Sequence, residues 1–374
     1  MRRNSGHTRA LTSAALIALI AVAVVIPSLE RVASAGGVRC NRMSLRERAA
    51  QTVIAGVPSA HFTDETRRLV RYNAGSVILL GHNIENRDQL KTLIARMKRN
   101  APKRLLVAVD EEGGRVARLG SEGLVRHLPS ARRIAQQRST DGVRMLGRKL
   151  GEEMRSLRVN WNLAPVLDVT GAPDYTVIGD RSYSHKARRV ARYGRSFARG
   201  LHRGGLMTVG KHFPGHGRTS EDSHESMPTV RVSMRQLRNR DLKPYFARRG
   251  TLDAVMSAHV RFTALNRKRP ASLSRATTEL LRQEVGFNGI LMTDDLAMGA
   301  ITNRWTIPRA ATMAIRAGAD MVLTTPSGAA YDIVQRITRK VRDEVIPRAR
   351  LNRAVERVLE AKGYGDRKVE CLLS

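Results

Sequence analysis

Aromatic side chains are scarce in this chain of 374 residues, which holds only two tryptophans, six phenylalanines and seven tyrosines. Tyrosine and tryptophan supply the large, rigid apolar faces on which flat or ring-shaped ligands stack. A composition with 4% aromatic residues therefore argues against a broad polysaccharide cleft lined by tryptophans. The hydrophobic fraction of 42% is still sufficient for a sizeable core.

Cysteine is also scarce, because the chain has only Cys40 and Cys371. The two residues stand near opposite ends of the sequence. Export from the cytoplasm would permit a disulfide between them, which would tie the two ends together. Sequence separation does not fix their distance in space, so the bonded and the reduced forms both remain open.

The first 35 residues differ in pattern from the rest of the chain. Three arginines within nine residues precede an apolar stretch over residues 11–26, and Ala33-Ser34-Ala35 follows as an A-x-A site. This order is typical of a secretory signal peptide. We expect residues 1–35 to be removed and the mature chain, residues 36–374, to be secreted or held in the cell wall. The alternative is an uncleaved anchor, although the apolar run is marginal for crossing a bilayer core of about 30 Å.

Acidic residues number 33 against 66 lysines and arginines, which gives a formal charge of +33. Residues 1–35 carry four arginines and one glutamate, so +30 remains on the mature chain. A field of this sign attracts polyanions. For an exported protein, anionic cell-wall polymers are better candidate partners than nucleic acid. Arginines and apolar residues alternate at helical period over residues 185–204, and a solvated helix face explains that pattern more simply than a wall-binding patch.

Short apolar runs alternate with amphipathic helical stretches along the whole mature chain. The eight runs are Thr52–Val57, Ser76–Gly81, Leu105–Asp110, Val159–Asp168, Leu206–Lys211, Ala254–Val260, Ile290–Asp294 and Met321–Thr325. Helical signals lie between them, such as the i, i+3, i+4, i+7 set that begins at Leu90 and the capping box formed by Ser44 and Glu47. Eight such alternations predict an α/β fold, a single-domain (β/α)₈ TIM barrel.

Polar residues collect where the predicted strands end, which is the end of a TIM barrel that carries catalysis. The segment from Lys211 to Gly217 reads KHFPGHG, and Asp222-Ser223-His224 follows it. A metal site is one interpretation of its histidines, but Pro214 and Gly215 prevent the helix that would align His212 with His216. In an extended loop the side chains of Asp222 and His224 would point to the same side. That pair would form an acid/base unit, whereas a surface ion pair is the alternative.

A second segment, residues 289–299, places two adjacent carboxylates at the end of an apolar strand. Side chains of neighbouring strand residues point to opposite faces, so only one of the pair should face the site. We expect Asp294 to act as a nucleophile on an anomeric carbon and Asp295 to be structural, for instance as a cap on the following helix.

These motifs resemble glycoside hydrolase family 3, in particular its single-domain β-N-acetylglucosaminidase branch. The resemblance extends from about Met43 to Gly363 and includes further segments that begin at Val109, Ala164, Val177 and Met256. It implies that Asp294 is the nucleophile and that His224, assisted by Asp222, is the acid/base. It also implies a set of sugar-binding residues, with no cofactor and no metal. That set is Asp110, Arg118, Arg181, Lys211 and His212.

The resemblance implies a retaining, exo-acting β-N-acetylglucosaminidase that removes terminal β-linked GlcNAc from peptidoglycan fragments or chitin-type oligosaccharides. Three alternatives stay open at this point. Two belong to the same family, a β-glucosidase and a GlcNAc phosphorylase. The third is a non-catalytic cell-wall-binding barrel, which intact Asp222, His224 and Asp294 disfavour. His216 and His259 are interpreted as loop and core scaffolding.

Overall fold

The computed structural model describes residues 41–246 and 250–374. The expected signal peptide and Cys40 lie outside these residues, so the cleavage stays a prediction and the bonded and reduced forms of Cys40 and Cys371 both stay open. Within the described part of the chain, no helix has both the length and the apolar character needed to cross a membrane.

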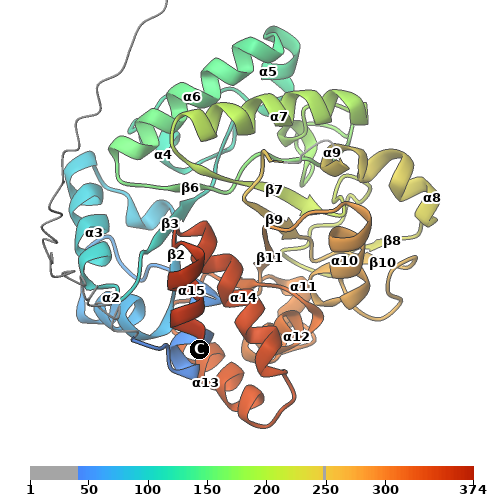
Figure 1. Ribbon diagram of the computed structural model, residues 1–374. Coiled ribbons are helices and arrows are strands. Elements are labelled where there is room, and N and C mark those ends of the chain that lie inside the picture. The colour runs from blue at the N-terminus through green and yellow to red at the C-terminus, as the bar shows by residue number, and fades with distance from the viewer. Residues whose placement is uncertain (1–40, 247–249) are drawn as a thin grey trace, which may run out of the picture. The chain divides into compact units, whose positions relative to one another are not determined.

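Eight parallel strands close into a barrel in the order β1-β12-β11-β9-β7-β6-β3-β2. Each strand coincides with one of the eight runs predicted from the sequence, although β7 and β11 extend past the predicted ends to Phe213 and Asp295. The (β/α)₈ barrel is therefore confirmed (Figure 1). The strands are β1 (Val53–Gly56), β2 (Ser76–Leu79), β3 (Leu106–Val109), β6 (Trp161–Asn162), β7 (Met207–Phe213), β9 (Ala254–Ser257), β11 (Ile290–Asp295) and β12 (Met321–Thr324).

Alternation along the strands divides the apolar residues into two buried groups. Ile54, Ile78 and Trp161 belong to the group that fills the barrel, while neighbours such as Val53 and Val77 pack outward against the helices. This two-sided burial explains why the strands read as continuous apolar runs. The inner group also contains Val358 of α14 (Arg348–Ala361). Figure 1 shows α14 lying across one end of the barrel, which this helix therefore closes.

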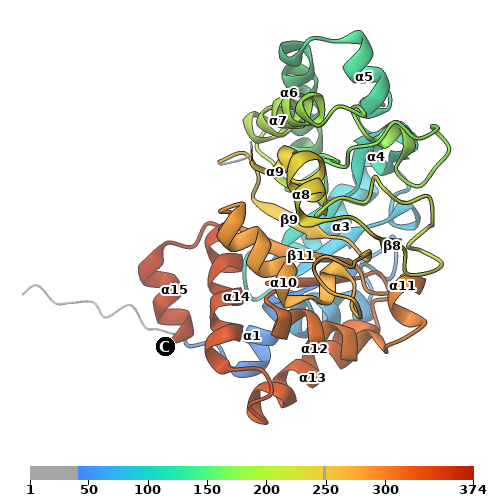
Figure 2. The same cartoon turned by 90° about the vertical axis from the view of Figure 1, so that its right-hand side faces the viewer.

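Helices surround the barrel in the positions that the sequence pattern predicts (Figure 2). The longer ones are α1 (Leu45–Gln51), α3 (Arg87–Asn100), α5 (Ala131–Gln137), α6 (Thr140–Ser156), α7 (Ala187–Arg203), α12 (Ile307–Ala317), α13 (Ala329–Arg342) and α15 (Asp366–Leu373). The shorter ones are α2 (Asp64–Arg68), α4 (Arg118–Ser121), α8 (Met234–Gln236), α9 (Lys243–Phe246), α10 (Arg275–Glu279) and α11 (Gly299–Thr302). Single turns of 3₁₀ or π helix are η1 (Leu69–Asn73), η2 (Gly81–Asn83), η3 (Gly179–Arg181), η4 (Leu237–Asp241), η5 (Ala271–Leu273) and η6 (Leu280–Glu284).

Local signals in the sequence are reproduced where they can be checked. Ser44 and Glu47 form the reciprocal capping box at the start of α1. Leu90 and Met97 lie on the buried face of α3, and α7 buries the apolar stripe that includes Val190 and Phe197. The amphipathic periods therefore position the helices correctly.

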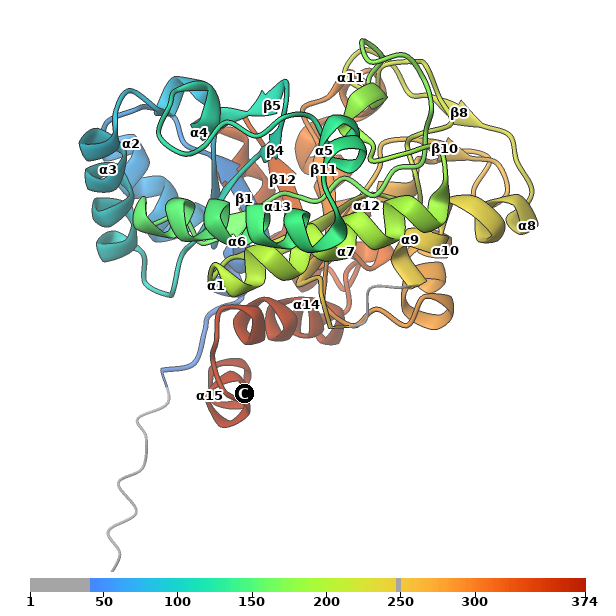
Figure 3. The ribbon, with the colours of Figure 1, turned by 90° about the horizontal axis from the view of Figure 1, so that it is seen from above.

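Two small sheets stand beyond the carboxyl ends of the barrel strands. One pairs β4 (Glu111–Gly113) with β5 (Val116–Ala117), and the other pairs β8 (Thr229–Val230) with β10 (Arg261–Phe262). Figure 3 shows β4, β5 and α11 at one end of the barrel and α14 and α15 at the other. The long loops that follow the strands therefore build one face, as the barrel architecture requires of an active-site face.

Helices α6 and α7 pack closely because glycines lie at their contact. A Cβ atom added at Gly147 would lie 2.7 Å from the carbonyl oxygen of Phe197 and 3.2 Å from the Cα of Gly200. One added at Gly151 would lie 3.0 Å from the Cα of Gly204. Backbone atoms form these contacts, so a side chain could be accommodated only by moving one helix.

We expect Gly147→Ala to lower the free energy of unfolding by about 2 kcal/mol, because overpacking at a close helix contact forces backbone shifts. Gly142→Ala on the same helix is the matched control, since its Cβ would lie 3.5 Å from the side-chain atoms of Arg138 and Ser139, an ordinary van der Waals distance. The control should be neutral or stabilising by up to about 1 kcal/mol. Urea denaturation of both variants measures the difference, and equal stabilities would show that the helix contact is not tight.

Candidate active site

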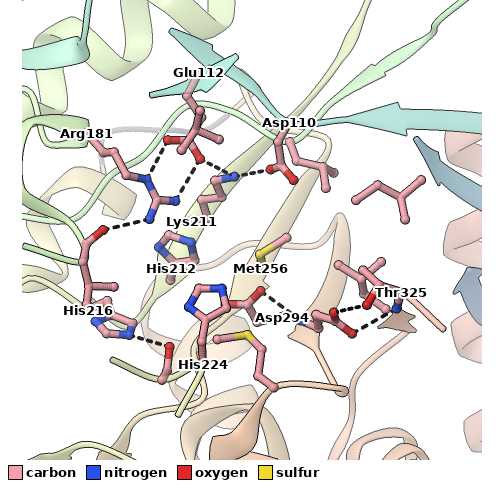
Figure 4. A pocket seen from close by; sticks show the side chains of 18 of the residues that line it. Asp110, Glu112, Arg181, Lys211, His212, His216, His224, Met256, Asp294 and Thr325 are labelled. Atoms are coloured by element: carbon pink, nitrogen blue, oxygen red, sulfur yellow. Dashed lines mark hydrogen bonds and ion pairs between the residues drawn. The ribbon is translucent and has the colours of Figure 1, made fainter. Parts of the chain in front are cut away.

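A cavity of about 210 Å³ opens at the carboxyl ends of the barrel strands (Figure 4). Seven of the eight site residues predicted from the sequence line it, and they come from loops after several different strands. They are Asp110, Arg118, Arg181, Lys211, His212, His224 and Asp294. Asp222 does not line the cavity but contacts His224. The structure therefore brings together residues that are up to 184 positions apart in sequence.

Lys211 and Arg181 do not stand free as sugar-binding cations, because both are tied to a buried glutamate. Lys211 Nζ lies 2.6 Å from Asp110 Oδ1 and 2.6 Å from Glu112 Oε1. Arg181 donates from Nε and Nη2 to the two carboxylate oxygens of Glu112, at 2.8 and 2.9 Å. Burial opposes the charged form of Glu112, but Arg181 and Lys211 outweigh it and hold the pKa of Glu112 far below its usual range.

Glu112 is the functional residue that the sequence interpretation missed, since only Asp110 was selected from that motif. Its side chain is 4% exposed. The signal was available, because residues two apart on an extended segment point to the same side. Asp110 and Glu112 both line the cavity and share Lys211.

His212 is oriented from behind by Asp168, which is fully buried. Asp168 Oδ2 lies 2.7 Å from His212 Nδ1, and its Oδ1 accepts the backbone N–H of His216 at 2.6 Å. Burial opposes ionisation of Asp168, but the charge of His212 and its hydrogen bond lower the pKa of the carboxyl group. His212 therefore presents Nε2 toward the cavity, and Asp168 is a second positioning residue that was not among the predicted site residues.

Asp294 lines the cavity with one carboxylate oxygen uncommitted. Its Oδ1 accepts the backbone N–H of Asp295 at 2.9 Å, whereas Oδ2 has no hydrogen bond within the described residues. Burial would raise the pKa of Asp294, but nearby His212 and His259, followed by the Asp295 N–H and Lys211, lower it. An ionised carboxylate with an available oxygen is the form that a nucleophile needs.

Asp295 corrects one expectation and refines another. Both aspartates line the cavity, although strict alternation would send only one of them there, because a β-bulge shifts the register between Met292 and Asp295. Asp295 is structural as expected, but it does not cap a helix. Its carboxylate binds the side chain and backbone of Thr325, at 2.6 and 3.1 Å, and so links the ends of β11 and β12.

His224 and Asp222 form the predicted pair, although on a turn and not on an extended loop. Asp222 Oδ1 lies 2.7 Å from His224 Nδ1 and also accepts the His224 backbone N–H at 2.9 Å. Burial opposes ionisation of Asp222, but these two hydrogen bonds and the charge of His224 together outweigh it and lower the pKa of the carboxyl group. The imidazole is 67% exposed, and its Nε2 has no partner within the described part of the chain. That nitrogen is available for proton transfer at the cavity.

Arg118 is the first residue of α4, and the buried Glu111 holds that turn in place. Glu111 Oε2 accepts the backbone N–H groups of Leu119 and Gly120, at 2.7 and 3.2 Å. Burial outweighs these hydrogen bonds and raises the pKa of Glu111 to about 7.

The two histidines interpreted as scaffolding are both buried. His216 Nε2 lies 3.0 Å from Ser223 Oγ, and burial together with the nearby His212 lowers the pKa of His216 to about 4. His259 contacts Ser272 Oγ at 2.7 Å and the carbonyl oxygen of Asp295 at 2.9 Å. Among residues 41–246 and 250–374, no group of three or more acidic, histidine or cysteine side chains is arranged to hold a metal ion.

Residues 44–361 match the glycosyl hydrolase family 3 N terminal domain. The chain belongs to glycosyl hydrolase family 3. It is therefore a glycoside hydrolase. Within this family, the beta-hexosaminidase LpqI of Mycobacterium tuberculosis is 36% identical over 356 residues, which cover 92% of this chain and 89% of the relative. A beta-hexosaminidase of Tolumonas auensis is 38% identical over 264 residues, 69% of this chain and 78% of its own.

Solved structures of family 3 enzymes have the same fold. A β-N-acetylglucosaminidase from Paenibacillus sp. superposes with a TM-score of 0.82 at 32% identity, covering 88% of this chain and 68% of that protein. NagZ from Neisseria gonorrhoeae, solved in complex with N-trifluoroacetyl-D-glucosamine, has a TM-score of 0.70 at 31% identity, with coverages of 87% and 94%.

In this family 3 hydrolase we expect Glu112→Gln to lower the free energy of unfolding at pH 7 by about 3 kcal/mol, because Arg181 and Lys211 lose a buried counter-charge. The pKa of Glu112 is depressed in the folded state, so its contribution is present above the ordinary glutamate value of 4.5 and falls as the pH drops below it. The difference between wild type and variant should therefore be constant from pH 8 to about pH 5 and shrink at lower pH.

Denaturation in urea at a series of pH values measures this difference. Glu279→Gln is the matched control, because Glu279 pairs with Arg275 on the surface and is 45% exposed. The control should change stability by less than about 1 kcal/mol. A Glu112 variant as stable as the control at pH 7 would contradict the central place given to this ion pair.

Proposed function

We propose that this hydrolase is a retaining, exo-acting β-N-acetylglucosaminidase. Its substrate would be a terminal β-linked GlcNAc on peptidoglycan fragments or chitin-type oligosaccharides. The observation that carries the proposal is the pair of uncommitted atoms at one cavity, Asp294 Oδ2 and His224 Nε2. A displacement at an anomeric carbon needs a nucleophile and a proton donor together.

In the first proposed step Asp294 Oδ2 attacks the anomeric carbon, and the bond from that carbon to the departing oxygen breaks. His224 in its imidazolium form protonates the departing oxygen, and a glycosyl-aspartate ester results. In the second step neutral His224 takes a proton from water, the water oxygen attacks the anomeric carbon, and Asp294 leaves. Asp222 holds Nδ1 throughout, which fixes the ring and supports its cationic form.

The ion-pair network supports the assignment of the sugar-binding residues. Because Glu112 fixes both Arg181 and Lys211, the cations cannot swing away from the cavity. Asp110, Arg118 and His212 add an acceptor and donors around the same space. Groups held at fixed positions can recognise several hydroxyls and one amide of a single sugar. The small cavity also suits an enzyme that takes one terminal sugar.

Support for the N-acetyl group comes from the relatives, several of which are named as beta-hexosaminidases, while a structural neighbour binds an N-acylated glucosamine. The signal-like N-terminus supports action outside the cytoplasm, in or near the cell wall. The formal charge of +33 favours an anionic environment such as wall polymers.

We expect the wild-type chain to cleave nitrophenyl β-GlcNAc in preference to nitrophenyl β-glucose, and Asp294→Asn to lower kcat by at least about 10³-fold, because an amide cannot attack the anomeric carbon. A slow fluorinated donor sugar should leave a covalent adduct that mass spectrometry maps to Asp294. An adduct on another residue would end the assignment.

The same assays separate the alternatives. Preference for the glucoside would indicate a β-glucosidase, and a phosphate-dependent rate with sugar phosphate as product would indicate a phosphorylase.

Asp320→Asn is not a suitable control for Asp294→Asn, because Asp320 is fully buried and forms ion pairs with three arginines. Asp332→Asn is the control, because Asp332 lies in α13 and does not line the cavity, and it should leave kcat unchanged.

His224→Ala should affect substrates according to their leaving groups, because only a poor leaving group needs a proton donor. We expect a loss of about 10²- to 10⁴-fold for a GlcNAc disaccharide and a much smaller loss for dinitrophenyl β-GlcNAc in the first step. Pre-steady-state release of the phenol measures that step. Equal losses for both substrates would show that His224 is not the acid.

A further inference from the structure

A second cavity, at the end of the barrel opposite the active site, is lined by six arginines. Its volume is about 390 Å³. Its walls are formed by α10, by η6, by the carboxyl end of α12 and by α14. The six are Arg275, Arg282, Arg316, Arg350, Arg353 and Arg357. We call this cavity the arginine groove. Figure 3 shows α14 on the side away from β4, β5 and α11.

The groove carries more positive charge than its carboxylates balance. Asp320, fully buried just before β12, lies 2.6 Å from Arg282, 2.9 Å from Arg350 and 3.2 Å from Arg357. One carboxylate therefore serves three guanidinium groups. Glu279 pairs with Arg275 at 2.8 Å. With both acids counted, the six arginines leave a formal surplus of +4.

The charged form of Arg282 is disfavoured in the folded protein. Burial, followed by the repulsion of Arg357 and Arg350, lowers the pKa of Arg282 to about 10 although Asp320 opposes the shift. A guanidinium pKa below its ordinary 12.5 means that the cation is less stable here than in water. A bound anion would offset both the desolvation and the repulsion.

Structural ion pairing explains part of the groove only. Arg282 and Arg350 also donate to backbone carbonyls such as those of Gly289 and Ala319, at 2.7 and 2.6 Å. These bonds join the segments that precede β11 and β12 at the amino ends of the strands. Arg316 and Arg353 have no such task, because they are exposed and make no hydrogen bond or ion pair within the described residues. Two arginines held at the rim of an already over-charged groove raise its repulsion without any compensating internal contact.

Donors are also left on two of the arginines that contact Asp320. Arg350 uses Nε and Nη2 for its contacts, and Arg357 uses Nε and Nη1. The remaining terminal nitrogens, Nη1 of Arg350 and Nη2 of Arg357, have no partner in the part of the chain that the structure describes. The floor and the rim of the groove therefore both offer guanidinium donors.

We propose that the arginine groove is a binding site for a phosphate group. Arginine presents a planar fork of donors that matches two oxygens of a phosphate, and several such forks surround a tetrahedral anion better than a planar carboxylate. The group is either inorganic phosphate or a phosphodiester of an anionic polymer. In the second case the polymer would hold the enzyme by the end of the barrel that faces away from the active site and leave the active-site cavity open.

Isothermal titration of the mature chain with sodium phosphate, and separately with poly(glycerol phosphate), tests the site at constant ionic strength in sodium chloride. The variant Arg316→Gln/Arg353→Gln removes the two rim arginines and leaves the Asp320 network intact. We expect saturable binding by wild type and at least about tenfold weaker binding by the variant, since each charged hydrogen bond contributes about one order of magnitude. If the polymer binds more tightly per phosphate group than the free ion does, the natural ligand is a phosphodiester of a polymer. If the free ion binds more tightly, the ligand is inorganic phosphate.

Arg188→Gln/Arg192→Gln is the matched control, because it removes two exposed arginines of α7 and the same net charge outside the groove. It should retain affinity within about twofold. Equal losses of phosphate affinity in the two variants would show that only diffuse electrostatic attraction is at work and would overturn the proposal. Absence of saturable binding by the wild-type chain would also overturn it. Unchanged kcat/KM on an aryl glycoside would show that both variants are folded. If phosphate bound in the active site instead, its affinity would not change when Arg316 and Arg353 are replaced.

Discussion

The salt bridge between Glu112 and the cations Arg181 and Lys211 is the interaction on which the site depends. It joins the small β4–β5 sheet and the turn η3, which both lie outside the barrel, to the barrel strand β7. A buried carboxylate with two cationic partners is stable only while all three are present. Because each partner also lines the cavity, the same contact that secures the loops gives the cavity a fixed charge pattern.

The barrel was predictable because its strands are buried on both faces and separated by amphipathic helices, and both features appear directly in the sequence. The ends of the strands were predictable for the same reason, so residues such as Lys211 and Asp294 could be assigned to one face. Asp294 and His224 needed the family motif in addition, since an aspartate at a strand end and an exposed histidine each have ordinary structural explanations.

Other features depend on distances that no sequence pattern encodes. Asp168 is conspicuous as the end of a run, but its hydrogen bonds to His212 and His216 arise only after two loops have packed over it. The bulge in β11 brings Asp295 to the cavity against the simple alternation. The arginine groove collects residues from 275 to 357 out of a chain rich in arginine throughout, so composition hides it.

The two proposed catalytic groups are carried by very different supports. Asp294 belongs to a barrel strand paired on both sides, whereas His224 sits on a surface turn. The backbone carbonyls of Ser223 and His224 in that turn accept the N–H groups of Ala300 and Gly299 in α11, at 3.1 and 2.7 Å. Side-chain substitutions in the turn that keep these backbone bonds could therefore change the contacts with the leaving part of a substrate, while the ion pairs of Glu112 with Arg181 and Lys211 stay in place. In an evolving lineage this scaffold could change the glycans it trims by altering one short surface segment.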